Sequence, residues 1–101
     1  MGLKEWSVAD LRNEFELPES SEYLGYAVHL EQTDEFLAEF SDTAIAIRRV
    51  WAKTPELALR FASLSRAVDA SRACKGSVVV VMFDIGKQIA VFGITGLRVV
   101  K

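Results

Sequence analysis

The sequence has few of the residues on which enzymes and metal sites usually depend. Its 101 residues include one cysteine, Cys74, and one histidine, His29. A single cysteine excludes a disulfide within the chain and is typical of a protein kept in the reducing cytoplasm. His29 has no second histidine or nearby cysteine as a partner, so a metal site or a general base is disfavoured there. The sequence predicts no catalytic residue, no metal and no cofactor, and favours a protein that is not an enzyme.

Long hydrophobic runs are absent as well. No apolar stretch approaches the roughly 20 residues that a membrane-spanning helix needs. The first fifteen residues lack the hydrophobic centre of a secretion signal. We therefore expect a cytoplasmic protein that does not contact a membrane. The glycines at positions 86, 93 and 96 are spaced for turns and do not form a phosphate-binding loop.

Apolar residues, by contrast, are plentiful. Half of the chain is hydrophobic and the mean hydropathy is +0.18, and the length predicts a single domain over residues 1–101. Two apolar runs, Val78–Phe83 and Gln88–Ile94, flank a turn at Asp84–Lys87, which predicts a β-hairpin with Ile85-Gly86 as its loop. Alternation gives each face five apolar side chains: Val78, Val80, Met82, Ile89 and Val91 on one, and Val79, Val81, Phe83, Ala90 and Phe92 on the other. The hairpin is therefore expected at the centre of the protein, covered on both sides.

Two shorter elements are expected before the middle of the chain. Ser7 is placed as an N-cap with Asp10 three residues later, which predicts a short helix over residues 8–16. Residues 23–30 alternate as a strand, with Leu24 and Tyr26 on the same face. Either a parallel or an antiparallel placement of this strand beside the hairpin is compatible with the sequence.

Two long helices are expected between this strand and the hairpin. The first, over residues 34–52, has an apolar stripe at helical spacing, formed by Phe36, Phe40, Ala44, Ile47 and Trp51. The second, over residues 55–74, would begin at Thr54-Pro55. The predicted fold is thus α+β in the order α-β-α-α-β-β. It has a small sheet of three or four strands around the C-terminal hairpin, packed on two long helices, with a short N-terminal helix. A further strand after Gly96 is left open.

This element order resembles that of the RelE/ParE-type toxins. The resemblance covers residues 23–101 as strand–helix–helix–strand–strand. Members of that family are small bacterial proteins that cleave ribosome-bound mRNA or poison gyrase. The resemblance therefore implies a toxin as the alternative function, to be tested by replacing Arg72, Lys75, Lys87 and Arg98.

Charge is divided unevenly along the chain. Residues 1–42 contain eleven acids and two bases, a net charge of −9, whereas residues 43–101 contain three acids and ten bases, a net charge of +7. The basic residues of the second half define a candidate basic binding face: Arg48, Arg49, Lys53, Arg60, Arg72 and Lys75. Nucleic acid is not the favoured partner, because Arg60, Arg66 and Arg72 lie six apart and would rotate around a helix.

The second face of the hairpin points to self-association. With the two long helices on one face, the short helix covers only part of the other, and soluble monomers rarely expose a large apolar patch. We expect a homodimer or larger assembly with an interface at Val79, Val81, Phe83, Phe92, Leu97 and Val99. Rising salt should weaken it if the acidic and basic halves meet. The predicted function is a non-enzymatic binding or assembly protein, with a protein partner or a small apolar ligand left open.

Overall fold

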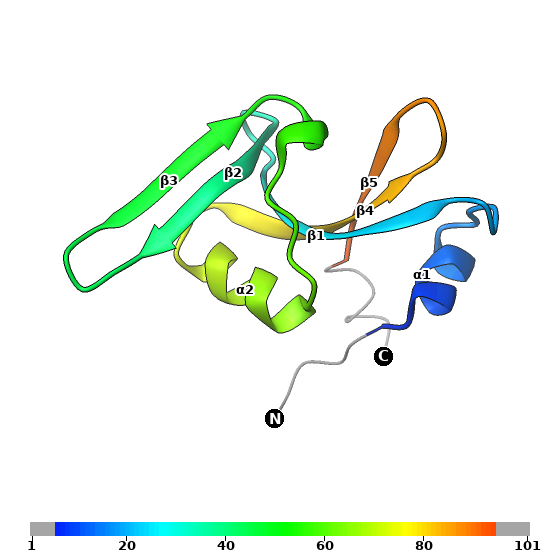
Figure 1. The fold of residues 1–101 in the computed structure, drawn as a ribbon, viewed down its shortest axis with the longest axis horizontal. Coiled ribbons are helices and arrows are strands. Elements are labelled where there is room, and N and C mark those ends of the chain that lie inside the picture. The colour runs from blue at the N-terminus through cyan, green and yellow to red at the C-terminus, as the bar shows by residue number, and fades with distance from the viewer. Residues whose placement is uncertain (1–5, 95–101) are drawn as a thin grey trace.

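The computed structural model describes residues 6–94 and shows an α+β protein with one five-stranded antiparallel sheet, in the order β3-β2-β1-β4-β5 (Figure 1). The elements follow in chain order: α1 (Val8–Glu14), β1 (Glu22–Leu30), β2 (Glu35–Asp42), β3 (Ile47–Ala52), the 3-10 helix η1 (Pro55–Leu57), α2 (Leu64–Arg72), β4 (Ser77–Asp84) and β5 (Ile89–Gly93). The central strand β1 runs antiparallel to β4, which decides the orientation that the sequence left open. None of the helices within residues 6–94 is long and apolar enough to cross a membrane.

The prediction of two long helices and of a three- or four-stranded sheet is wrong. Residues 34–52 form the β2–β3 hairpin, and the next segment forms only η1 before α2 begins at Leu64. A register shift between Leu37 and Glu39 interrupts the two-residue alternation that would have indicated a strand. The hydroxyl of Thr43 accepts hydrogen bonds from the Ile45 and Ala46 amides and closes the turn. The element order behind the resemblance to RelE/ParE-type toxins is therefore not present.

The predicted hairpin is confirmed as β4–β5, with its two faces divided as predicted. It does not lie at the centre of the sheet, because β5 is an edge strand and the central strand is β1. Val79, Val81, Phe83 and Phe92 belong to one apolar cluster, and Val78, Val80, Met82, Ile89 and Val91 belong to another. The loop lies one residue later than predicted, at Gly86-Lys87, because the Ile85 amide donates to the Gln88 carbonyl, and the partner of Asp84 becomes Ile89 instead of Lys87. A shift of two residues keeps every side chain on its predicted face.

Helices α1 and α2 pack on the same face of the sheet (Figure 1). The Ser7 hydroxyl accepts a hydrogen bond from the Asp10 amide at 3.0 Å, so the predicted cap of the short helix is confirmed. Leu11 from α1 and Leu64 from α2 are both buried against Val81 and Phe83. The opposite face is covered in part by the segment after β3, which buries Ala58 against Met82.

A bulge in β1 lets this segment cross the sheet. Gly25 has φ +115°, and the register of β1 against β4 shifts between Tyr23 and Gly25. Tyr26 and Phe61 then exchange two backbone hydrogen bonds of 2.9 and 2.8 Å, in the opening where β2 diverges from β1. The bulge places Leu24 and Tyr26 in clusters on opposite faces, whereas simple alternation predicted a shared face.

Candidate functional site

An open groove lies beside the C-terminal end of α2. It lies between β3 and the turn that leads from α2 into β4, and has a volume of about 310 Å³. Its lining combines two cationic side chains, one aromatic ring and small or apolar groups: Leu30, Arg49, Trp51, Ala73, Cys74 and Lys75.

The strand β3 positions the aromatic and one of the cations. Arg49 and Trp51 are two residues apart, so alternation places both side chains on the same face of the sheet. Trp51 packs against the cluster that contains Ala70 and Cys74, so this is the face that α2 covers. Lys75 reaches the same groove from the turn in which Gly76 adopts φ +83° before β4 begins.

The guanidinium of Arg49 is anchored at the end of α2. Its Nε donates a hydrogen bond of 3.1 Å to the carbonyl of Ala73, the C-cap residue of that helix. A cation suits this position because the carbonyl groups at a helix C-terminus carry partial negative charge. An arginine has five N–H donors, so this bond leaves others for a ligand.

Cys74 forms part of the groove wall, but its thiol is not set up for chemistry. Burial raises the pKa of the Cys74 thiol, and this effect outweighs the neighbouring Arg49 guanidinium, whose charge and hydrogen bond lower it. The thiol therefore stays protonated at neutral pH. Because the thiolate is the nucleophilic form, Cys74 acts as a small buried apolar group.

The structure separates the six residues of the predicted basic binding face. Three of them face acidic side chains at ion-pair distance: Arg48 with Glu39 at 3.5 Å, Lys53 with Glu35 at 3.7 Å and Arg72 with Asp69 at 3.8 Å. Arg60 is exposed ahead of α2. Only Arg49 and Lys75 are brought together, and neither belongs to an ion pair within residues 6–94.

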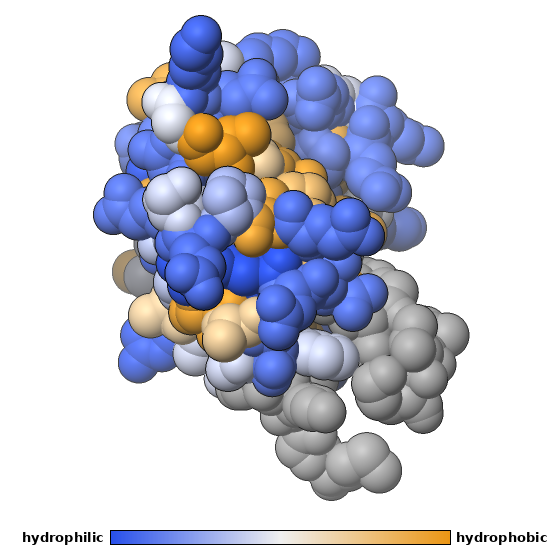
Figure 2. Space-filling view, turned by 90° about the vertical axis from the view of Figure 1, so that its right-hand side faces the viewer, coloured by the Kyte–Doolittle hydropathy of each residue, from blue (hydrophilic) through white to orange (hydrophobic). Residues whose placement is uncertain are grey.

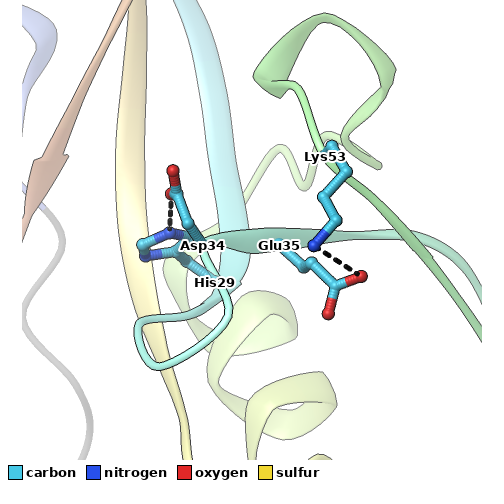
Figure 3. A network of polar contacts seen from close by, with 4 residues as sticks. All are labelled: His29, Asp34, Glu35 and Lys53. Carbon is cyan, nitrogen blue, oxygen red and sulfur yellow. Dashed lines mark hydrogen bonds and ion pairs between the residues drawn. The ribbon is translucent and has the colours of Figure 1, made fainter.

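His29 lies in a small polar network at the β1–β2 turn (Figure 3). Its Nε2 is 2.9 Å from the Asp34 carboxylate, and its ring stacks on Phe36 with 4.6 Å between centroids. The ion pair of Glu35 with Lys53 lies beside it. No group of three potential metal ligands occurs within the described part of the chain. The contacts of His29 thus tie the turn to β1.

The residues predicted for an oligomer interface are mostly covered within one chain. Val79, Val81 and Phe83 are buried beneath α1 and α2. Phe92 is half-buried, and its ring stacks on the ring of Phe15, the C-cap residue of α1, with 4.3 Å between the ring centroids. Leu97 and Val99 lie outside the described residues. The three buried residues are therefore not accessible to a partner chain.

The two edges of the sheet differ in character. At one edge, β3 carries Arg48 and Arg49, and its pairing with β2 includes a register shift. At the other, β5 consists of Ile89–Gly93, contains no charged residue or proline, and pairs with β4 without a register shift. The first four residues of β5 are half-buried, and the fifth, Gly93, is exposed.

Comparison with known proteins adds no relative to these observations. No family model, no curated protein and no solved structure matches this chain. The sequence reasoning missed the groove because it assigned Arg49 and Trp51 to a helix. A strand was indicated by the β-branched residues of this stretch, Thr43, Ile45, Ile47 and Val50. In a strand, Arg49 and Trp51 would lie on one face because they are two residues apart.

Proposed function

We propose that the protein is a non-enzymatic binding and assembly protein that forms a homodimer through the outer edge of β5. The observation that carries this proposal is the uncharged, proline-free edge formed by Ile89–Gly93. Strand edges present backbone N–H and C=O groups that can pair with another strand, and proteins usually protect them with charges, prolines or bulges. Figure 2 shows the side of the molecule on which α1 and the β4–β5 turn lie in Figure 1, with apolar patches between polar side chains.

The contrast with β3 supports the choice of edge. Arg48 and Arg49 occupy two of the six positions of β3, and the register shift in the β2–β3 pair disturbs the regular ladder there. Both features oppose strand addition. The β5 edge has neither feature, so a second strand can form backbone hydrogen bonds with it more readily than with β3.

A second copy of β5 is a suitable occupant because the strand is self-complementary. In an antiparallel pair centred on Val91, Ile89 lies opposite Gly93 of the partner subunit, and Ala90 lies opposite Phe92 of the partner subunit. No like charges meet, and residues directly opposite share a face. The proposal keeps Phe92 from the predicted interface and leaves out Val79, Val81 and Phe83, which α1 and α2 cover.

A cytoplasmic location belongs to the same proposal. The support for it is that the single cysteine, Cys74, is free and buried, a usage typical of reducing compartments. A dimer that depends on apolar strand pairing needs no oxidising conditions to assemble.

The test is the mass of the protein in solution, measured by light scattering at micromolar concentration. We expect about 22 kDa, twice the 11.2 kDa of one chain. Val91→Lys places two like charges next to the two-fold axis and should give a monomer. Val50→Lys makes the same change at a half-buried position of the other edge strand and should leave the dimer intact. Circular dichroism checks that both variants are folded.

Three results would overturn the proposal. The first is an 11.2 kDa species for the unsubstituted protein. The second is an equal mass for the folded Val91→Lys and Val50→Lys variants, because only the first should disrupt the dimer. The third is a monomer that dimerises only after deletion of residues 95–101, which would assign the β5 edge to the chain's own tail. Salt adds an independent check: pairing of uncharged strands should not weaken with ionic strength, whereas an assembly of the acidic and basic halves should.

A further inference from the structure

We propose that the groove lined by Arg49, Trp51 and Lys75 binds a small aromatic anion, with a carboxylate or phosphate attached to a flat apolar body. The groove is separate from the proposed dimer contact, because β3 and β5 lie at opposite ends of the strand order. Binding in the groove and pairing at the β5 edge can therefore succeed or fail independently.

The charges of the lining residues favour an anion. The groove contains two cationic side chains and no carboxylate. The Arg49 guanidinium is held in place by its hydrogen bond to the Ala73 carbonyl. A planar guanidinium with spare donors is well suited to the paired oxygens of a carboxylate or phosphate, and a lysine nearby adds a second charge-assisted hydrogen bond.

The end of α2 does not reverse this preference. The carbonyl groups at a helix C-terminus attract cations, which would favour the opposite ligand. Here the position is already occupied, because Arg49 bonds to the C-cap carbonyl of Ala73. A positively charged ligand would have to approach both Arg49 and Lys75 without a compensating acid in the lining.

The apolar part of the lining favours a flat ring on the ligand. Trp51 and Leu30 are half-buried, so each presents apolar surface to the groove. Ala73 and the protonated thiol of Cys74 are small and complete the wall. A volume of about 310 Å³ is at the lower end of ligand pockets, roughly 300–1,000 Å³. A ring with one anionic group fits this size and can stack on the indole of Trp51.

The test is a titration of the ¹⁵N-labelled protein followed by NMR. The probes are benzoate, phenyl phosphate, inorganic phosphate and benzylamine, the last a cation of nearly the same shape as benzoate. We expect saturable shifts at the amides of Arg49, Trp51 and Lys75 with the two aromatic anions. Inorganic phosphate should bind more weakly because it lacks the ring, and benzylamine should produce no saturable shift.

Substitutions identify the groups that bind the anion. Arg49→Ala and Lys75→Ala should each weaken binding about tenfold or more, the loss expected for one charge-assisted hydrogen bond. Arg48→Ala is the matched control, because Arg48 is adjacent in β3 but points to the other face. Arg49→Lys keeps the charge and should recover part of the affinity, which separates loss of the anion contact from a disturbed helix end.

The proposal is overturned if neither aromatic anion gives saturable shifts in the folded protein. It is also overturned if benzylamine binds as well as benzoate, or if Arg48→Ala weakens binding as much as Arg49→Ala. Shifts that saturate but map to residues outside the groove would overturn it too. The light-scattering mass of the same samples reports on the dimer separately.

Discussion

The two hairpins of this sheet are stabilised in different ways. In β4–β5, both faces of β4 lie inside apolar clusters, and Met82 and Phe83 are each 0% exposed. The β2–β3 hairpin extends away from the helices (Figure 1), and Ile45 at its tip is 96% exposed. The first hairpin is stabilised by burial on both sides. The second depends on burial only near its base, and on local hydrogen bonds at its tip.

This difference explains why the two hairpins were not equally easy to predict. Continuous apolar residues in β4 have few alternatives to a buried strand. The sequence of β2 and β3 mixes Ala, Glu and Arg, which favour helix, with β-branched residues, and it also has apolar residues at helical spacing. Where burial is weak, local patterns are ambiguous and small features such as a bulge decide the structure.

The largest expected effect comes from removing a matched aromatic from each hairpin. Phe83→Ala should lower the free energy of unfolding by about 3–5 kcal/mol, because it leaves a cavity in a fully buried site. Phe40→Ala should cost about 1 kcal/mol, because Phe40 in β2 is only half-buried. Urea unfolding at one fixed protein concentration measures both. Equal losses would contradict the view that the hairpins are held differently.

A smaller effect is expected at the bulge that separates the hairpins. Gly25→Ala forces a side chain into φ +115° and places its Cβ 3.0 Å from the Phe61 carbonyl oxygen. We expect a loss of about 2–3 kcal/mol from this strain. Gly86→Ala is the control, because Gly86 has a similar φ of +111° but a Cβ added there would meet no atom within 4 Å, so it should cost about 1 kcal/mol less than Gly25→Ala. A tolerated Gly25→Ala would show that the crossing segment can shift.

The turns provide a third comparison. Thr43→Ala removes the hydroxyl that bonds to the Ile45 and Ala46 amides, and Asp84→Ala removes the carboxylate that accepts from the Gly86 amide at 2.8 Å. Each loss should cost about 1 kcal/mol. Hydrogen exchange should nevertheless differ: Thr43→Ala should expose the amides of the β2–β3 tip, whereas Asp84→Ala should leave those of β4 protected. Loss of β4 protection would argue against stabilisation by burial.

The smallest effect is expected for the ion pairs on the β2–β3 hairpin. Glu39→Ala removes a contact of 3.5 Å with Arg48 between side chains that are 62% and 69% exposed. Water and salt screen such a pair, so the change in unfolding free energy should be below about 0.5 kcal/mol. Thermal melts in low and high salt are sufficient to measure it. A loss above 1 kcal/mol would mean that the pair supports the projecting hairpin.

Parts of the fold could be predicted because a local cause was sufficient. The cap at Ser7, the strand around Tyr26 and the two-sided hairpin each depend on residues close together in the chain. The groove could not be predicted in this way. It requires Arg49 from β3 to meet the end of α2, 24 residues further along the chain, and the helix assigned to residues 34–52 would have placed Arg49 and Trp51 differently.

The sequence by itself determined that a hairpin at residues 78–94 would be apolar on both faces and would need cover on each. It did so because side chains alternate along a strand whatever surrounds it. Only the tertiary structure decided what provides the cover: α1 and α2 on one face, and the segment containing Ala58 on the other. It also decided that residues 34–52 form strands, because the β2–β3 hairpin packs Phe40 and Trp51 against the cluster that contains Ala70 and Cys74, a gain that no window within residues 34–52 contains.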